Sequence, residues 1–160
     1  MFNNFSIIIP VLNEAENICE ILYEIENFLI LPNHIEKKHY EIIIVDDGST
    51  DNILDRLNNF KTNLNYKLLF HSNNLGQSHS ILTGIKNSIY DIIITIDGDG
   101  QNDPKDINKL FSTYLERKDV YLIGGIRSKR KDNFVKKFTS KIANRVRSFI
   151  LKDGCVDSGC

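Results

Sequence analysis

Cysteine is scarce in this chain of 160 residues, and its three copies form no pattern. Cys19, Cys155 and Cys160 show no CxxC spacing and have no histidine companion nearby, so neither a zinc site nor a disulfide framework is indicated. No apolar run approaches the roughly 20 residues that a membrane-spanning helix needs, and the N-terminus lacks the layout of a signal peptide. We therefore expect a cytoplasmic chain that does not cross a membrane.

Charge is distributed unevenly, although the formal net charge is only -1. Residues 1–126 carry 10 lysines and arginines against 18 aspartates and glutamates. Residues 127–152 reverse the balance, with 10 basic residues against the single acid Asp132. Such a basic stretch favours a polyanion, a phosphate ligand or an anionic membrane surface as partner.

Short apolar runs alternate with segments of helical periodicity. The apolar runs predict five buried strands, at residues 5–11, 40–45, 66–70, 91–96 and 120–126. Helical spacing predicts helices around residues 18–29, 53–57, 81–89 and 107–115. This order predicts an α/β fold with a mostly parallel sheet flanked by helices, in which ligands bind at the carboxyl ends of the strands. Because no linker or repeat divides the chain, we expect a single domain over residues 1–160.

Polar clusters follow the first, second and fourth predicted strands. They contain the sequences PVLNE, DDGSTD and DGDGQNDP, which begin at Pro10, Asp46 and Asp97. A parallel sheet brings such clusters to one edge. Neither GxGxxG nor GxxxxGKS/T is present, so dinucleotide and P-loop binding are not supported.

Asp97 and Asp99 are candidate metal ligands. Two carboxylates two residues apart at a strand end repel each other unless a cation neutralises them, and oxygen ligands select hard ions such as Mg²⁺ or Mn²⁺. Such an ion completes its shell with water and substrate phosphates, which indicates a nucleoside diphosphate, and Gln101 is a possible third ligand. The same loop favours a helix start, with Asp103 as N-cap and Pro104 as first helical residue, and we expect both roles.

The acidic loop allows two other interpretations. An EF-hand starting at Asp97 needs glycine at its sixth position and glutamate at its twelfth, which here are Asn102 and Asn108, so calcium buffering is rejected. A strand followed by Asp-x-Asp also resembles the haloacid-dehalogenase phosphatases. Against that remote alternative, Gln101 stands where those enzymes carry threonine or valine, and their motif usually opens the chain.

Asp47 and Glu14 each have two interpretations. The residues around Asp47 favour a turn, with Ser49, Thr50 or Asp51 as caps of the next helix. Alternatively, Asp47 accepts hydrogen bonds from the edge of a nucleobase. Glu14 either complements the N-terminus of a helix or contacts a ribose or base.

Four motifs occur in order along the chain: IIIPVLNEAENI, IIIVDDGSTDN, NNLGQSHSILTGI and ITIDGDGQNDPKDI. With these motifs the chain resembles the inverting glycosyltransferases of family 2. A further segment, GGIRSKRKDNFVKKFTSKIANRVRS followed by DSGC, is similar to the branch that glycosylates polyprenyl phosphates, typified by dolichyl-phosphate mannose synthase and bacterial undecaprenyl-phosphate transferases. The resemblance implies a Rossmann-like GT-A fold, a GDP- or UDP-sugar donor, a polyprenyl phosphate acceptor and Mg²⁺ or Mn²⁺. It implies a peripheral location at the cytoplasmic face of a membrane and no nucleic acid partner.

Matching positions imply the site residues. The resemblance implies that the nucleotide pocket is lined by Pro10, Leu12, Glu14, Val45, Asp47, Asp97 and Gly98. Asp97, Asp99 and Gln101 would hold the metal, and the catalytic residues would be Asp99 and Arg127. The Arg127 guanidinium would meet the donor diphosphate and stabilise charge on the leaving group. Leu12 departs from the aromatic residue that many relatives carry there, so the base is not predicted.

Residues 127–152 predict a basic amphipathic segment. Its apolar residues recur every four positions, at Phe134, Phe138, Ile142, Val146 and Ile150. Lys136 and Ser140 share a face and resemble the pair that relatives use for the acceptor phosphate, usually with arginine in place of the lysine. A solvated helix docked on the sheet and a helix lying on the membrane surface are the alternatives.

The chain stops at Cys160, where the family pattern enters another strand. We therefore expect a truncated catalytic domain that lacks the C-terminal part of the family fold, with residues 1–126 as its nucleotide-sugar-binding half. The alternative is a binding module that holds the nucleotide sugar without transferring it.

Overall fold

The computed structural model describes residues 4–29, 40–117 and 119–125. It divides the chain into two compact units, Met1–Phe111 and Ser112–Cys160, and each is considered by itself. The predicted site residues Arg127, Lys136 and Ser140 lie outside the described residues.

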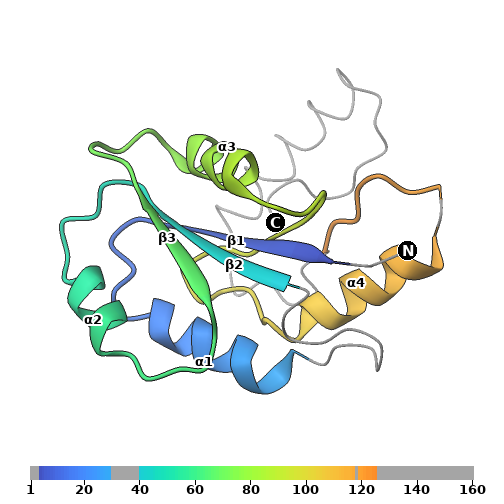
Figure 1. The fold of residues 1–160 in the computed structure, drawn as a ribbon, viewed down its shortest axis with the longest axis horizontal. Coiled ribbons are helices and arrows are strands. Elements are labelled where there is room, and N and C mark those ends of the chain that lie inside the picture. Colours follow the sequence, from blue (N-terminus) through green and yellow to red (C-terminus); the bar gives the residue numbers. More distant parts are fainter. Residues whose placement is uncertain (1–3, 30–39, 118, 126–160) are drawn as a thin grey trace, which may run out of the picture. The chain divides into compact units, whose positions relative to one another are not determined.

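The first unit contains a parallel sheet with the strand order β3-β2-β1-β4 (Figure 1). The strands are β1 (Phe5–Val11), β2 (Tyr40–Asp46), β3 (Tyr66–Phe70) and β4 (Ile92–Thr95). They alternate with the helices α1 (Ile18–Phe28), α2 (Ile53–Asn59), α3 (Gln77–Asn87) and α4 (Asp106–Glu116). The predicted α/β class and the predicted alternation are confirmed.

Strands β1 and β2 form the centre of the sheet because they are apolar on both faces. All seven residues of β1 and the last five of β2 are buried, as expected for parallel strands that are covered on both sides. Figure 1 shows α3 on one face of the sheet and α1 and α2 on the other. The helix α3 approaches β1 closely, because a Cβ atom added to Gly84 would lie 2.5 Å from Ile8 Cγ2. Glycine at this position therefore sets the separation of helix and sheet.

The pairing of β1 with β4 stops before β1 ends. The paired residues run from Phe5 and Ile92 to Ile8 and Thr95, and the Ile96 amide then donates to the Ile8 carbonyl at 3.1 Å. Residues of a central strand bond alternately to its two neighbours, so residue 10 would donate the next bond toward β4. Pro10 has no N–H with which to do so. The chain after β4 is thereby released to turn across the end of β1.

Two expectations are corrected. The strand predicted at residues 120–126 is wrong as far as the structure describes them, because residues 119–125 contain no strand and Leu122 is 88% exposed. An apolar run forms a strand only where a neighbour supplies backbone partners. Pro104, predicted as the first helical residue, lies in a turn just before α4, which begins at Asp106. Asp103 caps this turn, as predicted, because its Oδ1 accepts from the Lys105 amide at 3.0 Å. In the described part of the chain, no helix has the length and apolar character to span a membrane.

Candidate functional site

The loops that follow the four strands are joined at the carboxyl edge of the sheet. They comprise residues 12–17, 47–52, 71–76 and 96–105. Hydrogen bonds or close contacts link each loop to a neighbouring loop, strand end or helix. The polar clusters predicted to share one edge do lie there.

Asn13 ties the loop after β1 to the loop after β2. It adopts a φ of 58°, a left-handed conformation that asparagine tolerates. Its amide donates to Ser49 Oγ at 2.9 Å, and its Oδ1 accepts from the Thr50 amide at 2.8 Å. Asp51 Oδ2 accepts from the Ala15 amide at 2.9 Å. The N-cap residue of α2 is Asn52 rather than one of the predicted caps. Ser49, Thr50 and Asp51 instead hold the neighbouring loop in place.

Asp47 is buried, with 3% of its surface exposed, and fastens the loop after β3 to the end of β2. Its Oδ1 accepts from the Leu75 amide at 2.9 Å and lies 2.7 Å from His71 Nδ1. Its Oδ2 accepts from the Gly76 amide at 2.7 Å. His71 Nε2 reaches Thr83 Oγ1 in α3 at 2.9 Å, so the same network extends into the helix.

The pKa of Asp47 lies below the ordinary value for an aspartate. Desolvation by burial is the largest single effect and raises the pKa. Hydrogen bonds from His71, Ser80 and two backbone amides act in the opposite direction and together outweigh burial. Asp47 is therefore ionised at neutral pH, and His71 Nδ1 donates its N–H to the carboxylate.

Gly98 presses the loop after β4 against the end of β1. A Cβ atom at this position would lie 2.6 Å from Val11 Cγ1 and 2.8 Å from the Pro10 carbonyl oxygen. A backbone carbonyl cannot swing aside as a side chain can, so the close approach requires glycine. The contact places the acidic loop directly beside Pro10, one of the predicted nucleotide-binding residues.

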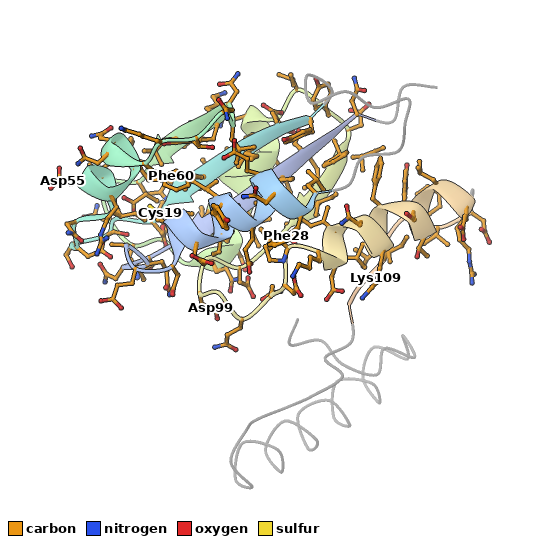
Figure 2. All side chains as sticks on the ribbon, turned by 90° about the horizontal axis from the view of Figure 1, so that it is seen from below. Cys19, Phe28, Asp55, Phe60, Asp99 and Lys109 are labelled. Atoms are coloured by element: carbon orange, nitrogen blue, oxygen red, sulfur yellow. The ribbon has the colours of Figure 1, made fainter. Side chains whose placement is uncertain are left out.

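Asp97 and Asp99 are both partly exposed on this loop, and Figure 2 shows Asp99 on the turn that precedes α4. Asp97 Oδ1 accepts from Gln77 Nε2 at 2.6 Å. Asp99 Oδ1 accepts from the Gln101 amide at 3.0 Å. Within the described residues, Asn102 carries a buried Oδ1 that has no hydrogen-bond partner.

The donors on this loop fit a hard divalent ion that keeps part of its water shell. Residues 4–29, 40–117 and 119–125 contain no group of three or more histidine, cysteine or acidic side chains that could hold a metal by themselves. Mg²⁺ usually takes one or two carboxylates, together with water and substrate phosphates. Two aspartates, the Gln101 amide oxygen and the unpartnered Asn102 Oδ1 supply only the oxygen ligands that such an ion prefers.

The remaining predicted nucleotide-binding residues lie at the same edge. Pro10 and Val45 are register partners across β1 and β2. Leu12 follows β1 and is 37% exposed. Glu14 is half-buried, and its Oε2 accepts from Asn17 Nδ2 at 2.6 Å, just before α1. The structure thus brings these residues together at one edge of the sheet.

Sequence reasoning gave no role to His71 or Gln77. His71 is one of four scattered histidines, and no spacing relates it to Asp47, 24 residues earlier. Gln77 lies within the motif NNLGQSHSILTGI, but nothing in that motif reveals that its side chain reaches Asp97. Both contacts depend on how the loops pack and cannot be read from spacing.

The fold and this edge together define a parallel α/β domain with an acidic loop at the carboxyl ends of its strands. The family model described as Glycosyl transferase family 2 matches residues 6–157. The chain belongs to this family.

Two of the curated proteins that the chain is similar to are named for polyprenyl phosphates. An undecaprenyl-phosphate 4-deoxy-4-formamido-L-arabinose transferase from Proteus mirabilis is 34% identical over 99% of this chain and 47% of its own length. A dodecaprenyl-phosphate galacturonate synthase from Rhizobium johnstonii is 33% identical over 97% of this chain and 45% of its own length. The chain thus spans about half the length of these relatives.

Solved structures share the fold. TarS residues 1–349 from S. aureus superposes with a TM-score of 0.57 at 23% identity, over 81% of this chain and 40% of TarS. The mannosyltransferase PcManGT from Pyrobaculum calidifontis, solved with GDP-Man and Mn²⁺, gives a TM-score of 0.50 at 24% identity, over 60% of this chain and 27% of its own. These likenesses establish the GT-A fold, of which this chain covers the N-terminal part.

Proposed function

We propose that the chain carries the nucleotide-sugar site of an inverting glycosyltransferase, which moves a sugar from a nucleoside-diphosphate sugar to a polyprenyl phosphate. The observation that carries the proposal is the acidic loop with Asp97 and Asp99, held by Gly98 against the end of β1 in a chain of family 2. The acceptor is proposed from the relatives, whose names specify undecaprenyl and dodecaprenyl phosphates. The haloacid-dehalogenase alternative gains no support from the family match.

The donor would lie along the carboxyl edge of the sheet. Its nucleoside would meet the loops after β1 and β2, which Asn13 holds together, and its diphosphate would face the loop after β4. Both oxygens of Asp47 already accept hydrogen bonds, so contact with a base would require Asp47 to share or exchange one of them. We propose Leu12 and Glu14 as the more accessible walls of the nucleoside pocket.

Asp97, Asp99 and Gln101 are the residues proposed to hold Mg²⁺ or Mn²⁺. When bound, the ion would neutralise charge that develops on the departing nucleoside diphosphate. Arg127, Lys136 and Ser140 stay predictions for the donor diphosphate and the acceptor phosphate. A basic segment that recognises a lipid phosphate would also favour a membrane surface, which we propose as the place of action.

The reaction needs no general base in this scheme. A phosphate monoester is an anion at pH 7, so its oxygen can attack the anomeric carbon directly. The new bond forms from this oxygen to the anomeric carbon, while the bond to the nucleoside diphosphate breaks and the leaving group takes its electron pair. Configuration at the anomeric carbon inverts. The protein has to position the acceptor phosphate and the donor diphosphate and to stabilise the departing nucleoside diphosphate.

Calorimetry with a panel of nucleoside diphosphates tests the proposal. We expect either GDP or UDP to bind to the chain in the presence of Mn²⁺, and the corresponding nucleotide sugar to be consumed when a short polyprenyl phosphate is added. Binding without transfer would identify a binding module. Release of phosphate from p-nitrophenyl phosphate, with no nucleotide binding, would contradict the proposal in favour of a phosphatase.

A further inference from the structure

We propose that Gln77 is a positioning residue for Asp97, whose carboxylate it orients toward the divalent ion through its side-chain amide. The inference rests on the proposed function, because that function gives Asp97 the role of ion ligand. It adds a residue from a different element, since Gln77 begins α3 whereas Asp97 follows β4.

The contact is short and its direction is fixed by chemistry. Gln77 Nε2 lies 2.6 Å from Asp97 Oδ1. An ionised carboxylate can only accept hydrogen bonds, so the amide must present its N–H group rather than its carbonyl. Hydrogen bonds to a charged acceptor are shorter and stronger than those between neutral groups. The bond therefore restricts rotation of the carboxylate about its χ2 angle.

The backbone is held in place both before and after Gln77 in the chain. Gly76, which precedes it, donates its amide to Asp47 Oδ2 at 2.7 Å. Further along α3, Gly84 brings the helix against Ile8 in β1. Because Asp47 directly follows β2 and is buried, and β1 is a central strand of the sheet, the start of α3 that carries Gln77 is held at two places.

The absence of charge on Gln77 suits a positioning role. A lysine or arginine at this place would neutralise the carboxylate and compete with a divalent cation. A neutral amide orients the carboxylate and leaves its negative charge available to the ion. Partners of this kind behind a ligand typically contribute about 10- to 100-fold to metal affinity.

Titration of Mn²⁺ into the full 160-residue chain, with unbound Mn²⁺ measured by electron paramagnetic resonance, tests the inference. Gln77→Met keeps the length of the side chain but removes the donor. We expect it to weaken Mn²⁺ binding by about tenfold, while the melting temperature stays that of the wild type because the side chain is exposed. Ser78→Met is the matched control, since it places the same side chain at the neighbouring exposed position.

The outcomes separate this inference from the proposed function. If the wild type binds Mn²⁺ and Gln77→Met binds it equally well, Gln77 has no positioning role and the proposed function stands. An equal loss of Mn²⁺ affinity in Ser78→Met would also overturn the inference, because the loss would then follow from any change in the first turn of α3. If the wild type binds no Mn²⁺ either alone or with GDP or UDP present, Asp97 is no ion ligand, and the inference and the metal part of the proposed function are both wrong.

Discussion

Replacing Asp99 by alanine is expected to reduce sugar transfer by about 100- to 1,000-fold while the chain stays folded. The side chain is partly exposed, and in the described part of the chain its carboxylate accepts one hydrogen bond, from the Gln101 amide. Little stability therefore depends on it. Its proposed task is to hold, together with Asp97 and Gln101, the ion that stabilises the leaving diphosphate, and alanine removes one of the two carboxylates from this set. The rate of sugar transfer to a short polyprenyl phosphate measures the loss of activity. Calorimetry with a nucleoside diphosphate and Mn²⁺ measures the accompanying loss of binding.

Asp103→Ala is the matched control for this variant. Asp103 Oδ1 accepts from the amide two residues later, at 3.0 Å, as Asp99 Oδ1 does, so both substitutions break the same kind of turn. We expect Asp103→Ala to retain transfer, and EDTA to reproduce the Asp99→Ala defect in the wild type. Full activity of Asp99→Ala, or of the wild type in EDTA, would contradict the assignment of the metal.

Replacing Asp47 by asparagine is expected to lower the free energy of unfolding by about 2–3 kcal/mol at pH 7. The carboxylate is buried and accepts from His71 and from two backbone amides. An asparagine side chain offers one acceptor oxygen and turns an NH₂ group toward these donors, which leaves at least one of them buried and unpaired. Urea unfolding measures the change. Asp55→Asn, on the exposed face of α2 (Figure 2), is the control and should be neutral.

The effect of Asp47→Asn should depend on pH with a defined sign. Because the pKa of Asp47 is lowered in the folded chain, its contribution to stability is fully present above the pKa of the unfolded state, about 3.9. It is lost as the pH falls through the lower pKa of the folded state. The unfolding free energies of wild type and variant should therefore stay apart from about pH 5 to 8 and converge below about pH 4. A difference in unfolding free energy that stays constant down to pH 2 would show that the charge of Asp47 does not stabilise the fold.

Much of the fold could be predicted from the sequence, because burial of the strands leaves a clear signal. The runs at residues 5–11 and 66–70 coincide with β1 and β3, and β2 extends one residue beyond its predicted end. The run at residues 120–126 is also largely apolar, but it contains Gly124 and Gly125 and forms no strand in its described part. Apolar composition reports a preference for burial, whereas a strand also needs a partner, and the sequence does not say whether one is available.

The site was predictable where it depends on strand ends and unpredictable where it depends on contacts between loops. Asp97 and Asp99 follow a strand of a parallel sheet, so their edge is fixed by topology. The partners of Asp47 lie 24 to 33 residues away in the chain, and Gln77 lies 20 residues from Asp97. No periodicity relates such positions. The hydrogen bonds of Asp47 and Gln77 could therefore be found only in the structure.

A crystal of the chain grown with Mn²⁺ and the nucleoside diphosphate that binds best tests the central claim most directly. We expect an anomalous scattering peak between the carboxylates of Asp97 and Asp99, in contact with the diphosphate oxygens at the carboxyl edge of the sheet. A diphosphate bound elsewhere on the molecule, or a bound diphosphate with no anomalous peak at these two side chains, would contradict the account.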